Sequence, residues 1–180
     1  IKGIYKLKGS TVKKPKLKVQ LLGSGTILRE VEAAAELLKS DHKVEADIWS
    51  ATSINQLCRE GNDCERWNML HPEAEPKVPY VSELLNAQDA PVICATDYIK
   101  AYGEQLRPYI DARYVVLGTD GYGRSDTRAK LREHFEVDRY YVTVAALKAL
   151  SDEGKIAASV VSKAIADYGL DAEKISPMHR

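Results

Sequence analysis

One stretch of the sequence, residues 118–126, combines the residue types of a functional loop: Gly-Thr-Asp-Gly-Tyr-Gly-Arg-Ser-Asp. Gly121 and Gly123 permit backbone angles that other residues resist. Arg124 could pair with an anion or with a carboxylate of a partner, and Ser125 or Asp126 could cap a following helix. No nucleophile, base and orienting group accompany the loop, so it predicts binding or assembly and not catalysis. Its candidate interface or ligand residues are Asp120, Tyr122, Arg124, Ser125 and Asp126.

A second unusual stretch is residues 63–72, Asp-Cys-Glu-Arg-Trp-Asn-Met-Leu-His-Pro. We expect it to lie in an irregular segment, 62–79, as an Ω-type loop held by its own contacts. Arg66 would pair with a neighbouring acidic residue, Asp63 or Glu65, and the apolar side chains of Trp67, Met69 and Leu70 would be buried. The alternative is an interface loop, because Trp, Met and Arg are common interface anchors. The candidate residues are Arg66, Trp67 and His71.

The sequence gives little support for a nucleotide-binding site or a metal site. Gly23-Ser-Gly25 follows an expected strand, but a dinucleotide fingerprint needs a third glycine where Leu28 stands. Cys58 and Cys64 have the wrong spacing for a zinc site, and no second pair completes a tetrahedral set. We therefore expect structural or incidental thiols, with Cys94 in the core of a strand.

Hydrophobic periodicity predicts the elements that position these residues. Strands are expected at residues 3–7, 17–22, 44–50, 91–96 and 114–118. Helices are expected at residues 26–39, 54–60, 81–86, 98–110, 126–135, 138–152 and 156–168. Gly61 would end the second helix, and Gly154 and Gly169 would stop the last two. A lysine-rich connector, part of 8–16, would be solvated.

Strands that alternate with helices predict a three-layer α/β fold, in which a mostly parallel sheet has helices on both faces. Right-handed crossovers bring the carboxyl ends of the strands to one edge, where ligands usually bind. The residues that follow the strands there are small or polar, and they include Asp97 and Asp120. Helix capping is the main role we expect for them, and a ligand-binding edge is the alternative.

Composition limits the classes of protein that are possible. The 180 residues form one domain, with an edge strand and linker at 1–16 and an α/β core at 17–180. Twenty-six basic residues balance twenty-six acidic ones, which disfavours nucleic-acid binding. No apolar run is long enough for a membrane span, and three cysteines indicate a reducing, cytoplasmic location. The chain begins at Ile1 and not at Met, which indicates a fragment or a processed product.

Four stretches together resemble a known family. GTDGYGRSDTRAKLREHFEVD (118–138), DCERWNMLHP (63–72), VQLLGSGTILREVEAAAELL (19–38) and ATDYIKAYGEQLRPYI (95–110) are similar to the C-terminal part of the homodimeric, bacterial-type pyruvate dehydrogenase decarboxylase component. Transketolases are broader relatives. The resemblance implies a five-stranded sheet, with residues 3–7 as its one antiparallel edge strand.

The resemblance also implies what the whole enzyme does. Such an enzyme decarboxylates pyruvate on thiamine diphosphate with magnesium and then acetylates a lipoyl group. This domain lacks the Gly-Asp-Gly…Asn motif that holds the metal diphosphate, so we expect no catalytic, cofactor or metal residue here and no activity of the chain alone. The implied partners are the remaining domains, the second subunit of a homodimer and the dihydrolipoyl acetyltransferase component. The alternative function is a small-ligand or regulatory module at the sheet edge.

Overall fold

The computed structural model describes residues 2–179 and contains one five-stranded sheet. Its strands are β1 (Ile4–Lys8), β2 (Lys18–Gly23), β3 (Glu45–Ala51), β4 (Val92–Ala95) and β5 (Tyr114–Leu117). The order across the sheet is β1-β3-β2-β4-β5. β1 is antiparallel to β3, and every other pair is parallel. The expected mostly parallel sheet with an antiparallel edge strand is confirmed.

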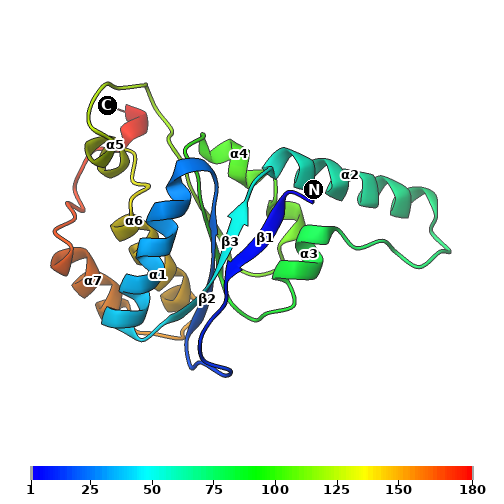
Figure 1. Cartoon of the computed structure of the whole chain (residues 1–180), viewed down its shortest axis with the longest axis horizontal. Helices are drawn as coiled ribbons and strands as arrows, with labels where there is room; N and C mark the ends of the chain where they lie inside the picture. The colour runs from blue at the N-terminus through cyan, green and yellow to red at the C-terminus, as the bar shows by residue number, and fades with distance from the viewer. Residues whose placement is uncertain (1, 180) are drawn as a thin grey trace.

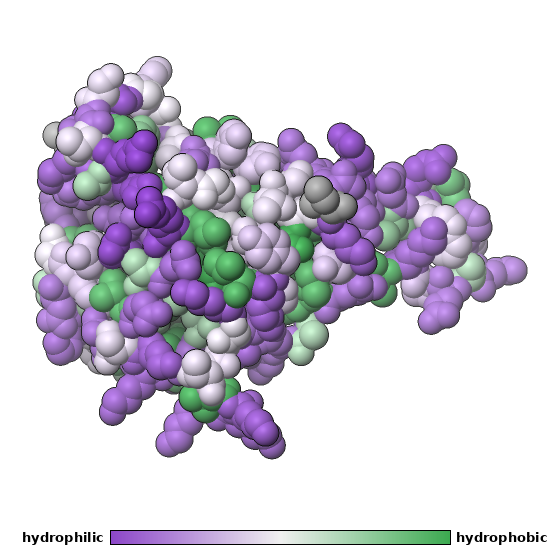
Figure 2. Space-filling model, in the orientation of Figure 1, coloured by the Kyte–Doolittle hydropathy of each residue, from purple (hydrophilic) through white to green (hydrophobic). Residues whose placement is uncertain are grey.

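Helices cover both faces of the sheet, so the fold has three layers, as predicted. The α-helices are α1 (Leu28–His42), α2 (Ile54–Leu70), α3 (Tyr80–Leu85), α4 (Lys100–Glu104), α5 (Arg128–His134), α6 (Arg139–Asp152) and α7 (Ala158–Asp167). Short 3-10 turns are η1 (Gly25–Ile27), η2 (Arg107–Tyr109) and η3 (Pro177–His179). In Figure 1, α1, α6 and α7 lie on one side of the sheet, and α2, α3 and α4 lie on the other. The end of α2 projects from the body, and this projection is mainly hydrophilic in Figure 2.

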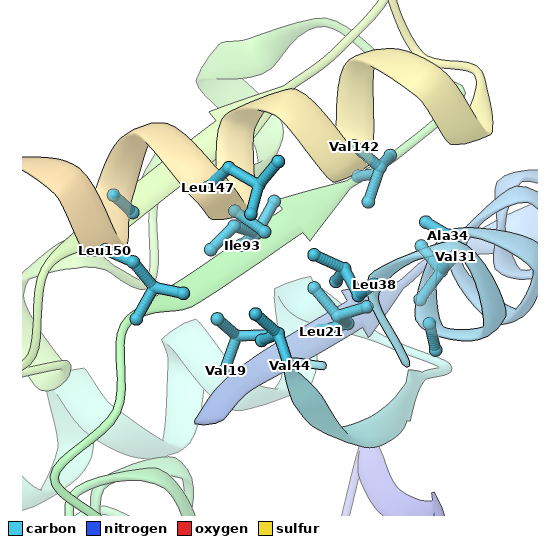
Figure 3. Close-up of a cluster of buried hydrophobic side chains, with 14 of the residues drawn as sticks. Val19, Leu21, Val31, Ala34, Leu38, Val44, Ile93, Val142, Leu147 and Leu150 are labelled. Atoms are coloured by element: carbon cyan, nitrogen blue, oxygen red, sulfur yellow. The ribbon is translucent and has the colours of Figure 1, made fainter. Parts of the chain in front are cut away.

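The alternation of side chains along the strands builds the first core. Leu21 on β2 lies opposite Ile48 on β3 and Ile93 on β4, and all three point to the same face. Figure 3 shows Leu21 and Ile93 between α1 and α6. The predicted stripe of α1, which is Ile27, Val31, Ala34 and Leu38, is buried in this core. The 3.6-residue period of the sequence therefore identified the correct face of α1.

The second core lies on the opposite face. Leu22 on β2 and Cys94 on β4 are fully buried there, together with Leu57 of α2 and Val81 of α3. The expected core position of Cys94 is confirmed. Within residues 2–179, no helix has both the length and the apolar character that crossing a membrane requires.

The prediction for residues 54–79 is wrong in one important respect. α2 does not end at Gly61 but continues to Leu70, so the first half of the expected irregular segment 62–79 is helical. Gly61 is buried, and a Cβ atom there would lie 2.5 Å from the ring of Tyr109. The glycine allows the helix to pack closely on Tyr109 and does not end it.

The predicted helix 98–110 is also not continuous, since it forms α4 and η2. Ile99 has an extended backbone, and its side chain is 55% exposed instead of lying in the core. The helix starts at Lys100, whose backbone N–H donates to Asp120 Oδ1 at 2.9 Å. Pro108 lies in η2, where its ring ends the regular helical pattern.

The last two helices end where the glycines predict. Gly154 and Gly169 have φ values of +71° and +65°, in the left-handed region that favours glycine. Asp138 caps α6 by accepting from the backbone N–H groups of Tyr140 and Tyr141. α7 begins at Ala158, two residues later than residue 156, where we predicted its start.

Asp47 fastens the edge strand and the start of the connector to the sheet. Its buried carboxylate accepts from Lys6 Nζ at 2.9 Å and from the backbone N–H of Ser10 at 2.8 Å, and Lys18 Nζ lies 3.0 Å away. Burial alone would raise the pKa of Asp47, but these partners outweigh it and lower the pKa to about 2. The connector is therefore anchored at Ser10, although its lysines are mostly exposed as predicted.

Candidate functional site

We expected Asp97 and Asp120, at the carboxyl edge of the sheet, to cap the helices that follow them, but they accept from backbone N–H groups of segments that precede them in the chain. Asp97, after β4, accepts from the backbone N–H of Thr26 at 3.2 Å and lies 3.3 Å from its hydroxyl. Asp120, after β5, accepts from the backbone N–H of Lys100. Asp97 thus caps η1, which follows the neighbouring strand β2, and Asp120 caps α4, which follows the neighbouring strand β4. The two aspartates therefore link the loops along this edge.

An open cleft of about 360 Å³ lies at the same edge. The cleft lies between η1, the loop 118–127 and α5, and its floor includes the buried side chains of Ile27 and Val137. Three arginines and one aspartate supply its charged groups. They are Arg124, Arg128, Arg132 and Asp97.

Glu30 neutralises one of these arginines. Its buried carboxylate accepts from Arg132 at 2.7 Å and from Arg139 Nε at 2.9 Å. The backbone N–H of Arg139 also donates to it, at 3.1 Å. Burial alone would raise the pKa of Glu30, but the bonds and charges of Arg139 and Arg132 lower it. A charged Glu30 therefore joins α1 to α5 and α6 at one wall of the cleft.

The loop 118–127 differs in detail from its prediction. Gly121 has a φ of +107° and packs closely on the Pro177 carbonyl, whereas Gly123 does not have a positive φ. Neither Ser125 nor Asp126 caps α5. Thr127 is the cap, and its hydroxyl accepts from the backbone N–H of Lys130. The helix begins two residues later than predicted, because Asp126 Oδ1 instead accepts from the backbone N–H of Thr127.

Two guanidinium groups at the cleft are available to a ligand. Among residues 2–179, neither Arg124 nor Arg128 has a hydrogen-bond or ion-pair partner for its guanidinium group. The structure thus brings Asp97 and Arg124, both predicted, into one cleft, but Arg128 and Arg132 were not predicted. Arg128 and Arg132 are four residues apart on α5, and this spacing after a glycine-rich loop was the available signal. Ligand binding at this edge remains a prediction.

The other candidate residues lie on the projection formed by residues 62–79, which we call the arm. Asn68 joins the helical half of the arm to its returning segment. Its Nδ2 donates to the Lys77 carbonyl at 2.9 Å, and its Oδ1 accepts from the Lys77 backbone N–H at 2.7 Å. The ring of His71 stacks on Trp67 at 4.4 Å, and Lys77 Nζ lies 4.6 Å from the Trp67 centroid. These contacts give the arm a defined shape.

The apolar side chains of the arm are less buried than expected. Trp67 is half-buried beneath His71 and Lys77, but Met69 and Leu70 are 71% and 52% exposed, and Val78 is 53% exposed. Because α2 continues through this stretch, the tip of the arm, which we define as Met69, Leu70 and Val78, lies beyond both cores (Figure 1). Arg66 forms no ion pair within the described chain, so its expected pairing with Asp63 or Glu65 is wrong.

The side chains that most often bind metals are dispersed in the described part of the chain. Between residues 2 and 179, no group of three or more His, Cys, Asp or Glu side chains could hold a metal ion. All three cysteines are free thiols. Burial is the main cause that raises the pKa of both Cys64 and Cys94 to about 11, so neither is an activated nucleophile.

Two solved transketolases have a fold similar to that of this chain. A transketolase from Leishmania mexicana superposes with a TM-score of 0.53 over 84% of this chain and 18% of that one, at 18% identity. A transketolase from Pichia stipitis gives a TM-score of 0.55 over 83% of this chain and 18% of that one, at 15% identity.

Sequence relatives are much closer. The chain is 54% identical over 178 residues to the pyruvate dehydrogenase E1 component of Cupriavidus necator, and 55% identical over 177 residues to that of Escherichia coli K12. These matches cover 99% and 98% of the chain and 20% of each relative, so the chain spans about a fifth of their length. A family model described as the transketolase-like TK C-terminal domain matches residues 3–138. The resemblance expected from the sequence motifs is therefore confirmed, and the chain belongs to the family of transketolase-like C-terminal domains.

Proposed function

We propose that this chain is the C-terminal structural and assembly domain of a longer enzyme of the pyruvate dehydrogenase E1 type. The length and identity of the relatives support this proposal. The longer enzyme, called the parent enzyme below, would be a cytoplasmic homodimer that decarboxylates pyruvate on thiamine diphosphate with magnesium. It would then acetylate lipoyl groups of a dihydrolipoyl acetyltransferase. In this proposal the other domains hold the cofactor, and this domain supports them.

The arm is the observation that carries the assembly role. The pair of bonds between Asn68 and Lys77 and the stacking of Trp67 on His71 fix its shape before any partner binds. A fixed element loses little conformational entropy on docking, which favours binding. We propose that the arm packs against the remaining domains of the parent enzyme.

Apolar side chains at the tip provide the contact. Met69, Leu70 and Val78 expose more than half of their surface to water. Complete burial of a side chain of this kind stabilises by roughly 1.5–3 kcal/mol. Together with the aromatic and basic groups of Trp67 and Arg66, they form the mixture that is enriched at interface centres.

Substitution of the tip in the complete parent enzyme tests this role. Met69→Ser, Leu70→Ser and Val78→Ser together should weaken dimerisation or lower the thermal stability of the assembled enzyme, measured by sedimentation velocity and calorimetry. The 180-residue chain with the same changes should keep its own melting temperature within a few degrees, because the tip lies outside both cores.

A matched control uses two exposed apolar residues away from the arm. Val12→Ser and Ile175→Ser remove exposed apolar side chains from the connector and the C-terminal segment. They should leave the assembly of the parent enzyme unchanged. If the arm variant behaved like this control in dimerisation, stability and turnover, the arm would have no assembly role.

A further inference from the structure

We propose that the cleft at the carboxyl edge of the sheet binds a small organic anion, in which a carboxylate or phosphate head is joined to an apolar body. This role goes beyond assembly and does not depend on it. The cleft is formed by η1, the loop 118–127 and α5, all within this chain.

The head group would bind to Arg124 and Arg128. Both side chains line the cleft, and within the described chain neither guanidinium has a partner. A guanidinium group presents planar, paired N–H donors that match the oxygens of carboxylate and phosphate groups. Two such groups at one opening therefore favour an anion.

The other charged groups of the cleft are already engaged. Arg132 donates to the buried Glu30, and Asp97 accepts from Thr26. Because Glu30 neutralises Arg132, the uncompensated charges among the lining residues are those of Arg124 and Arg128 against that of Asp97, a net excess of one positive charge. This balance favours anions over neutral or cationic ligands.

The apolar side chains of the cleft indicate that the part of the ligand away from its charged head is also apolar. Ile27 and Val137 are buried beneath it, and Leu131 and Phe135 are partly buried at its wall. These four side chains offer an apolar and partly aromatic surface next to the arginines. The volume of about 360 Å³ lies at the small end of the range for ligand sites, roughly 300–1,000 Å³, so the ligand should be compact.

Titration of the 180-residue chain by NMR tests the proposal. The probes are phenyl phosphate, benzoate, benzamide as the neutral counterpart, and inorganic phosphate as a head group without a body. Phenyl phosphate or benzoate should shift the backbone amide signals of Thr26, Thr119, Gly121 and Gly123. Benzamide and inorganic phosphate should each bind at least about tenfold more weakly, because each lacks one half of the ligand. Comparison of the two aromatic anions distinguishes a phosphate site from a carboxylate site.

Charge-removing variants locate the head group. Arg124→Gln and Arg128→Gln should each weaken binding of the better probe by roughly tenfold. Both side chains are exposed, so the variants should fold. Arg59→Gln, an exposed arginine on α2, is the control and should bind as the unchanged chain does. The proposal is overturned if no probe shifts these amides at 10 mM, if benzamide binds as well as benzoate, or if both variants match the control.

Discussion

Two buried carboxylates hold distant parts of this chain together. Asp47 fastens the edge strand and Ser10 to β3, and Glu30 fastens α1 to Arg132 and Arg139. Both remain charged because their cationic partners outweigh the cost of burial. Breaking such a pair leaves a buried charge without compensation, which is strongly destabilising.

Asp47 should make the free energy of unfolding depend on pH in the acidic range. Its folded pKa of about 2 lies below the ordinary value of 3.8, so its stabilisation is complete above about pH 4 and is lost as the pH falls towards 2. Asp47→Asn should lower the free energy of unfolding by about 2 kcal/mol at pH 7. Urea unfolding should show this difference shrinking between pH 4 and pH 2.5. The exposed Asp63→Asn is the control, and a pH-independent loss in Asp47→Asn would refute this linkage.

Glu30 should be more costly to replace than an exposed glutamate of the same helix. Glu30→Gln keeps the shape but removes the charge that faces two arginines, and it should destabilise by about 2–3 kcal/mol in urea unfolding. Glu36→Gln on the exposed side of α1 should change the stability by less than about 0.5 kcal/mol. If Glu30→Gln and Glu36→Gln changed the free energy of unfolding equally, the ion pairs of Glu30 with Arg132 and Arg139 would not contribute specifically to stability.

At this scale the sequence predicted polar side chains at the sheet edge but not their partners. Asp97 and Asp120 were expected to cap the helices after them, but they accept from Thr26 and Lys100, which lie 71 and 20 residues earlier in the chain. The partners of Glu30 lie 102 and 109 residues away along the chain, and no local pattern connects them. Arg66 does not pair with the adjacent Glu65, because consecutive residues of a helix do not face each other. Asp63 is three residues before Arg66 on the same helix, and nothing in the structure explains why these two do not pair.

At the scale of elements, α2 shows that tertiary packing can outweigh the low helix propensity of a glycine. Glycine disfavours a helix interior and suggested an end at residue 61. The close contact of Gly61 with the Tyr109 ring makes the same glycine necessary inside the helix. The extra turns of α2 then create the arm, so the arm could not be predicted once Gly61 was taken as a stop.

Gly61→Ala should therefore have the opposite effect from the one that helix propensity predicts. In an open helix this change stabilises by roughly 0.5–1 kcal/mol. Here the added methyl group must displace Tyr109, and we expect a loss of about 1–3 kcal/mol in urea unfolding. Gln56→Ala, on the exposed surface of α2, is the control and should be nearly neutral. A stabilised Gly61→Ala variant would contradict the packing role.

Strong periodic elements were predicted well, and irregular ones were not. The four parallel strands were recognisable as short, mainly apolar runs, because both faces of the sheet are buried. α1 follows from its 3.6-residue period. The late start of α4 at Lys100 involves Asp120, which lies twenty residues away in the chain. The cleft likewise depends on three segments that meet only in the folded chain.

The whole molecule has two substantial cores but no recognisable catalytic set among the residues that the structure describes. Both faces of the sheet are packed, so the chain should fold by itself. Its buried thiols have raised pKa values, and its acidic residues at the sheet edge are engaged in capping. We expect this organisation if the chain is the supporting domain that we propose.

The isolated chain should therefore have no turnover. Incubation with pyruvate, thiamine diphosphate, magnesium and an artificial electron acceptor should give a rate indistinguishable from the buffer blank, whereas the parent enzyme should be active. Circular dichroism before and after the assay checks that the chain is folded. Turnover by the folded chain would contradict its role as a supporting domain.

Hydrogen–deuterium exchange tests the central claim most directly. The amides of the arm, residues 62–79, are compared in the 180-residue chain and in the complete parent enzyme, with those of α7 as the internal reference. Docking predicts that exchange near Met69, Leu70 and Val78 slows by at least about tenfold in the parent enzyme, while α7 changes less. Equal exchange of the arm in both proteins would contradict the claim that it is the docking element of an assembly domain.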